Sequence, residues 1–159
     1  MVPVGSGNTE RLVRAFQVLG TDALGCTPSY AIYLADWCRA RDIDPLSLGI
    51  RQIAVAGEPG GGEPATRGLI QDAFGANVRE ALGIADVSPS LWGECEEQAG
   101  MHFCGNDYVH IELIDPADDA PLAWEDGAEG ELVYTSLRRE AMPVPVSYTH
   151  LTLPTTPYV

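Results

Sequence analysis

The amino-acid sequence predicts an α/β fold, in which a partial parallel sheet with flanking helices is followed by an antiparallel β section. Apolar runs of strand length alternate with segments of helical periodicity over about residues 1–91, a pattern typical of parallel sheets covered by helices. Residues 107–115 and 130–137 then read as two β runs, the first with strict apolar and polar alternation, and we expect them to pair antiparallel. The β-rich part is expected over residues 92–145.

The first expected helix lies within residues 7–20. Asn8 or Thr9 can cap its amino end, the apolar residues recur at helical spacing, and Gly20 is a stop signal. A strand and a turn are expected over residues 77–88.

Two strand-to-helix units are expected between them, in residues 22–41 and 48–75. Each places a proline, Pro28 or Pro64, at the first helical position, where the missing N–H costs nothing. Gly75 ends the second helix.

The composition excludes several classes of function. A formal net charge of −14 repels phosphate backbones and anionic lipid, so we expect neither a nucleic-acid partner nor a membrane-surface partner. All nine basic residues are Arg, so this chain offers no Lys for a Schiff base, a general base or a phosphate-binding loop. No signal peptide or membrane-spanning run is recognisable, which favours the cytoplasm and reduced thiols.

A Gly-rich segment, AVAGEPGGGEPATR, joins a strand to a helix. Helix amino ends attract anions, but Glu58 and Glu63 would repel a pyrophosphate. Two interpretations stay open: a plain strand-to-helix connection, or a nucleotide loop whose backbone contacts the base or nucleoside.

Asp86 follows a strand, and a carboxylate at the carboxyl end of a parallel strand can hold Mg²⁺ beside a phosphate. The alternative is a solvated acid on an acidic protein. Tyr30, in a helix with Tyr33 and Trp37, either packs in the core or lines a pocket for an aromatic substrate.

Cys95, His102 and Cys104 carry thiolate and imidazole groups, which are ligands that Zn²⁺ prefers. A fourth ligand and the paired C-x-x-C spacing are missing. One hypothesis for the whole chain is therefore a small, non-enzymatic binding module stabilised by zinc.

Several blocks resemble, in order and spacing, the phenylacetate-CoA ligases of the adenylate-forming acyl-CoA synthetase superfamily. They cover residues 2–145 and read VPVGSGNTERLVRAFQVLGTDALGCTPSYAIYLAD, AVAGEP, ALGIADV, WGECEEQAGMHF, IELIDP and GAEGELVYTSLRREAMPV. The resemblance implies an internal fragment of a large N-terminal domain. It also implies two-step chemistry, in which ATP and a phenylacetate-like acid form an acyl-adenylate that CoA then attacks.

The resemblance assigns roles to individual positions. Gly57, Glu58 and Pro59 match the block that contacts adenine. Residues 82–86 match a block with an aromatic ring that stacks on adenine, a hydroxyl residue and a Glu that serves Mg²⁺. Here Leu82 replaces the ring, Gly83 keeps the glycine, Ala85 lacks the hydroxyl and Asp86 keeps a carboxylate on a shorter arm. By similarity, Tyr30 lies near the acyl pocket.

The family also has a phosphate loop before this region and a Lys-bearing domain after it, so we expect the isolated chain to be inactive, with Met1 an internal start. Composition changes abruptly after Pro145. Residues 146–159 resemble a translated sequencing adapter, and we expect them to be a non-native tail.

Overall fold

The computed structural model describes residues 7–140 and 147–148. The chain forms two compact units, one ending at Glu80 and one beginning at Ala81. Among the described residues, no helix is both long enough and apolar enough to cross a membrane.

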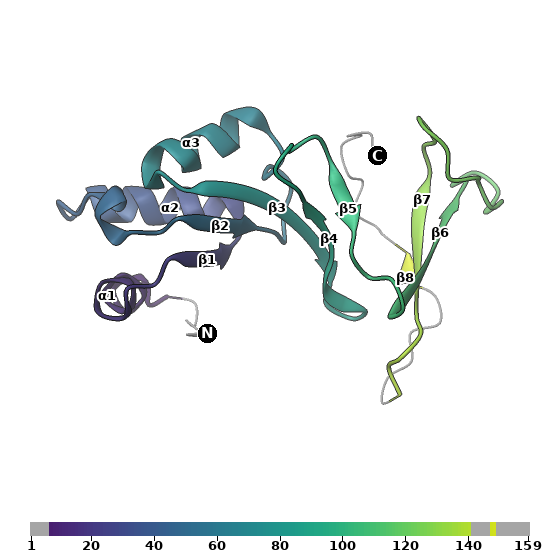
Figure 1. Ribbon diagram of the computed structural model, residues 1–159, viewed down its shortest axis with the longest axis horizontal. Coiled ribbons are helices and arrows are strands. Elements are labelled where there is room, and N and C mark those ends of the chain that lie inside the picture. The colour runs from purple at the N-terminus through teal and green to yellow at the C-terminus, as the bar shows by residue number, and fades with distance from the viewer. Residues whose placement is uncertain (1–6, 141–146, 149–159) are drawn as a thin grey trace. The chain divides into compact units, whose positions relative to one another are not determined.

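The first unit contains three parallel strands, three α-helices and a short 3-10 helix, shown in purple to teal in Figure 1. Their bounds are α1 Thr9–Leu19, β1 Ala23–Cys26, α2 Pro28–Arg39, η1 Pro45–Leu48, β2 Gln52–Val55, α3 Pro64–Phe74 and β3 Asn77–Ile84. β1 pairs with β2, and β2 pairs with the first half of β3, all parallel. The predicted parallel sheet with its helices is confirmed.

The helices begin and end where local side chains satisfy their terminal backbone groups. Asn8 accepts a hydrogen bond from the backbone N–H of Arg11, and Gly20 closes α1 in a left-handed conformation. Thr27 caps α2, with Pro28 in the first turn. Gly75 closes α3.

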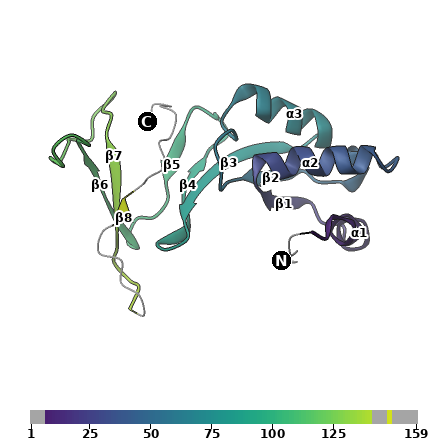
Figure 2. The same cartoon turned by 180° about the vertical axis from the view of Figure 1, so that it is seen from behind.

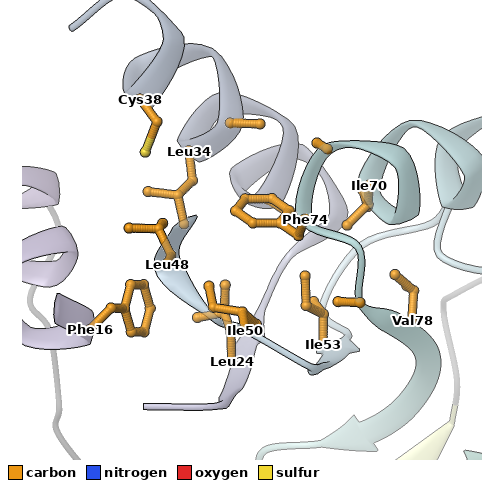
Figure 3. Close-up of a cluster of buried hydrophobic side chains, with 14 of the residues drawn as sticks. Phe16, Leu24, Leu34, Cys38, Leu48, Ile50, Ile53, Ile70, Phe74 and Val78 are labelled. Carbon is orange, nitrogen blue, oxygen red and sulfur yellow. The ribbon is translucent and has the colours of Figure 1, made fainter. Parts of the chain in front are cut away.

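One face of the parallel strands carries the core of the first unit. α2 lies behind these strands in Figure 1 and in front of them in Figure 2, and α3 packs against α2. Figure 3 shows Leu34, Ile70 and Phe74 from the helices meeting Ile53 and Val78 from the strands. Alternate strand positions point to the opposite face, where side chains are exposed.

The second unit is built from antiparallel strands. They are the second half of β3, β4 Ser88–Glu94, β5 Met101–Phe103, β6 Val109–Ile114, β7 Glu131–Ser136 and β8 Ser147–Tyr148. β3, β4 and β5 pair in sequence, and β6, β7 and β8 form a separate sheet. The predicted antiparallel pairing of the two late β runs is confirmed by the β6 and β7 register.

The position at which the two units divide was not predicted. The sequence indicated a change of architecture at about residue 91, which lies inside β4, whereas the compact units divide between Glu80 and Ala81. The reason is that β3 serves both units, pairing parallel with β2 over residues 77–80 and antiparallel with β4 over residues 81–84. The expected non-native tail, residues 146–159, lies outside the described residues except for the two residues of β8.

Candidate functional site

The carboxyl ends of β1 and β2 lie at the same edge of the parallel sheet, where open α/β sheets bind ligands. β1 ends at Cys26 and leads through Thr27 into α2. β2 ends at Val55 and leads into the Gly-rich loop of residues 56–63, which ends at α3. This edge therefore carries a helix amino end and a glycine-rich loop side by side.

Side chains from two segments satisfy the first turn of α2. The Thr27 hydroxyl accepts a hydrogen bond from the backbone N–H of Tyr30 at 3.3 Å. Glu58 of the loop accepts one from the backbone N–H of Ser29 at 2.7 Å. Hydrogen bonding by the Ser29 side chain first, and by its backbone N–H second, lowers the pKa of the Glu58 carboxyl.

Gly57 lies next to this contact in a conformation that L-residues rarely adopt, with φ of +89°. A Cβ at this position would lie 3.5 Å from the Thr27 methyl carbon Cγ2, so the loop backbone packs directly on the α2 cap. Pro59 is exposed and Glu58 is half-buried. Exposed loop carbonyls of this kind can accept hydrogen bonds from the amino group of a base.

Two charged side chains, Arg67 and Glu80, lie against the end of the loop that precedes α3. Arg67 of α3 is only 8% exposed, and its Nε donates a hydrogen bond to the Gly61 carbonyl at 3.1 Å. The Glu80 carboxylate lies so close to the loop that a Cβ on Gly62 would meet its Oε2 at 2.6 Å. Sequence reasoning predicted a contact with the loop for neither side chain; the only signal for Arg67 was its place in the segment that follows the glycines.

Cys26 lies at the end of β1, near Glu58. Burial first, and the negative charge of Glu58 second, raise the pKa of the Cys26 thiol to about 12. The thiol therefore stays protonated at neutral pH, and a neutral thiol is a poor nucleophile.

Tyr30 packs partly against the core of the first unit. Its hydroxyl lies 3.3 Å from the Thr9 hydroxyl of α1, and its ring centroid lies 5.8 Å from that of Tyr33. A surface hollow of about 240 Å³ between α1 and α2 is lined by Tyr33, Trp37 and Arg41 but not by Tyr30. The contacts favour the packing interpretation of Tyr30, and the acyl-pocket interpretation stays a prediction.

The second predicted nucleotide block ends β3 and turns into β4, in the second unit. Leu82 is only 8% exposed and belongs to the core of that unit. Gly83 sits at a register shift between β3 and β4, where a Cβ would lie 2.2 Å from the Pro89 carbonyl oxygen. The β3–β4 pairing leaves this glycine no room for a side chain.

Asp86 is exposed in the turn between β3 and β4, and its backbone carbonyl accepts a hydrogen bond from Arg139. The sequence placed this acid after a parallel strand, but the half of β3 that leads to it pairs antiparallel with β4. Over residues 7–140 and 147–148, no three His, Cys, Asp or Glu side chains form a group that could hold a metal ion. Asp86 as a magnesium ligand stays a prediction.

The predicted zinc ligands are not brought together. The backbone N–H of Cys104 bonds to the carbonyl of Leu91, while Cys95 lies just beyond the other end of β4. Leu91 and Cys95 are four positions apart along extended backbone, which corresponds to roughly 13 Å. The Cys104 thiol contacts the His102 carbonyl instead. Zn²⁺ needs its ligands within about 2.3 Å of one point, so these three residues do not form the predicted site.

Comparison with known proteins shows what this arrangement is similar to. No family model matches the chain. A phenylacetate-coenzyme A ligase of Thermus thermophilus is 34% identical over 146 residues, which are 91% of this chain and 32% of that protein. One of Pseudomonas putida is 33% identical over 145 residues. Over most of its length, this chain is homologous to the phenylacetate-coenzyme A ligases.

A solved structure supports the same relationship. A 2-hydroxyisobutyryl-CoA ligase in complex with its acyl-AMP and CoA superposes with a TM-score of 0.79 at 31% identity, over 92% of this chain and 34% of that one. The chain spans about a third of the length of the phenylacetate-coenzyme A ligases it matches. The family resemblance of the sequence blocks is confirmed.

Proposed function

We propose that this chain is part of the large N-terminal domain of an AMP-forming acyl- or aryl-CoA ligase, the predicted domain of residues 1–145. Such an enzyme converts ATP and a carboxylic acid to an acyl-adenylate with release of pyrophosphate, and then transfers the acyl group to the CoA thiol with release of AMP. The observation that carries the proposal is the homology to phenylacetate-coenzyme A ligases over 91% of the chain. The related 2-hydroxyisobutyryl-CoA ligase holds an acyl-AMP and CoA, which supports the same ligand classes, and a phenylacetate-like acid is the proposed substrate.

Within this chain, the Gly57–Pro59 loop is the proposed contact for the nucleotide base. Its backbone lies at the ligand-binding edge of the parallel sheet and needs no cation to hold a base or nucleoside. Tyr30, on the helix that follows β1, is the proposed acyl-side residue.

In the second unit, Leu82 and Gly83 carry the second family block and are proposed to contribute backbone and packing rather than a stacking ring. Asp86 is the proposed Mg²⁺ ligand. A single exposed carboxylate suits this ion, which usually keeps several waters and binds through one or two carboxylates plus substrate phosphates. The ion would neutralise phosphate charge there.

The isolated chain is proposed to bind nucleotide without completing the reaction. Adenylate formation requires preorganised charge stabilisation around the transferred phosphate, and the chain contains no Lys. We expect no ATP-dependent acyl-CoA synthesis above background when the purified chain is given ATP, Mg²⁺, CoA and phenylacetate. Turnover above that background would contradict the inactivity.

Nucleotide binding is tested by titrating AMP while backbone amide signals are followed by NMR. We expect the largest shifts at residues 57–62. Gly57→Ala should weaken binding about tenfold, because an L-residue in a left-handed conformation costs ~1–2 kcal/mol.

Gly49→Ala is the matched control, since Gly49 also has a positive φ, +72°, with open space around its Cβ position and no part in the loop. It should leave AMP affinity unchanged. Equal losses in the two variants would count against the loop as the binding site.

A further inference from the structure

We infer that Glu58 is a positioning residue, which fastens the Gly57–Pro59 loop to the first turn of α2 so that the loop is already ordered for its ligand. The inference rests on the proposed function in one respect, namely that the loop contacts the nucleotide. The fastening itself is a property of this chain and is measurable without any ligand.

The geometry at the α2 end favours a strong contact. The Glu58 Oε1 lies 2.7 Å from the Ser29 backbone nitrogen, although the two residues are 29 positions apart in sequence. This distance is typical of a hydrogen bond assisted by charge. The first N–H groups of a helix have no partner inside the helix, and the positive end of the helix dipole attracts a carboxylate.

The cap of α2 is shared between two segments. Thr27 accepts from the N–H of Tyr30, and Glu58 accepts from the N–H of Ser29. The first bond is local and fixes the helix start, whereas the second joins the helix to a loop from another strand. Because Pro59 follows Glu58, the Glu58 backbone is restricted to extended conformations, which reduces the freedom that the loop loses when the contact forms.

The other end of the loop is braced independently. Arg67 holds the Gly61 carbonyl, and the Glu80 carboxylate lies against Gly61 and Gly62. Gly57 and Pro59 thus lie on a segment held near both ends, with Glu58 as the hold on the α2 side. A loop that is ordered before binding avoids the entropy cost of ordering it on binding.

This contact also gives one of the two carboxylates of the loop a hydrogen-bond partner. Glu58 and Glu63 both suggested repulsion of an anionic nucleotide. The Glu58 carboxylate is instead engaged by a helix amino end, whereas Glu63 makes no side-chain capping bond at the start of α3. The substitution Glu63→Ala therefore serves as a matched control, because it removes one negative charge from the same loop and keeps the contact between Glu58 and Ser29.

The test compares Glu58→Ala, Glu58→Gln and Glu63→Ala in the full chain. Hydrogen exchange of the Ser29 amide, measured by NMR, should become roughly three to ten times faster in Glu58→Ala, as expected for loss of one hydrogen bond. Glu58→Gln should lie between the wild type and Glu58→Ala, because its amide oxygen still accepts the hydrogen bond but without the negative charge. Glu63→Ala should leave the exchange rate unchanged.

AMP titration of the same variants tests the positioning role. Affinity should fall roughly threefold or more in Glu58→Ala, since the loop must then be ordered by the ligand, and Glu58→Gln should recover part of it. Unchanged Ser29 exchange in Glu58→Ala, or an equal change in Glu63→Ala, overturns the fastening.

Two further outcomes separate the inference from the proposed function. Faster Ser29 exchange with unaltered AMP affinity overturns the positioning role and leaves Glu58 as a structural contact. If the wild type does not bind AMP at all, nucleotide positioning by Glu58 is overturned together with the proposed function of the loop. The exchange result then reports the fastening alone.

Discussion

Each of the two family blocks of this chain contains a glycine, but the two positions require glycine for different structural reasons. In the first unit, Gly57 lies in an exposed loop, and the residues that order the loop come from elsewhere in sequence: Ser29 and Arg67. In the second unit, Gly83 lies inside a strand pairing, under the Pro89 carbonyl. Position 57 requires glycine because of its positive φ, whereas position 83 requires glycine because there is no space for a Cβ atom.

The difference extends to the neighbouring side chains. Glu58 keeps the family pattern and is engaged at its carboxylate, while Leu82 departs from the pattern and is buried in a hydrophobic core. Burying a leucine contributes about 1.5–3 kcal/mol to folding. Leu82 thus contributes to the stability of the second unit.

Gly83→Ala tests the sharpest part of this comparison and should have the largest effect. Its Cβ would meet the Pro89 carbonyl oxygen at 2.2 Å, a backbone atom that cannot move without opening the β3–β4 pairing. We expect a loss of at least about 3 kcal/mol in the free energy of unfolding, measured by urea denaturation followed by tryptophan fluorescence.

Gly93→Ala on β4 is the control, because a Cβ there meets nothing within 4 Å. It should be neutral or stabilising by up to about 1 kcal/mol. Similar losses in the two variants would show that space around Gly83 does not distinguish the second block.

Much of the first unit could be predicted from the sequence because its signals are local. Asn8, Thr27 and Gly75 mark helix ends through contacts within one turn. The alternation in residues 107–115 likewise predicted β6, since burial of one face repeats with period two.

The unpredicted features depend on partners far apart in sequence. β4 contains Ser and Pro and lacks a strict alternation, so its pairing with β3 gave no local signal. The contact of Glu58 with Ser29, and that of Glu80 with the glycines, require the parallel register of the strands. The zinc hypothesis failed for the same reason, because residues near in sequence were separated along the β4–β5 ladder.

Tyr134→Phe probes the core that contains Leu82 and should have a smaller effect. The Trp92 indole N–H donates to the Tyr134 hydroxyl at 2.9 Å, and Trp92 lies opposite Leu82 in the β3–β4 register. Removing this acceptor should cost about 1 kcal/mol of unfolding free energy in the same urea experiment. Tyr108→Phe is the control, since Tyr108 is exposed, and an equal loss there would argue against a specific role for the buried bond.

The smallest expected effect is a pH dependence confined to the first block. Because hydrogen bonding by the Ser29 side chain first, and by its backbone N–H second, lowers the pKa of Glu58, the charge assistance of the contact is fully present above the ordinary glutamate range and is lost as the pH falls through the lowered pKa. The neighbouring Cys26 thiol, with its raised pKa, stays neutral throughout this acidic range, and Glu63 in the same loop makes no side-chain capping bond.

We therefore expect the Ser29 amide chemical shift of the wild type to show a titration step below the ordinary glutamate pKa. Glu58→Gln should abolish the step, because its side chain does not titrate, and Glu63→Ala should keep it. A step that persists in Glu58→Gln would assign the titration to another group, and the first block would then lack the side-chain contact that distinguishes it from the second.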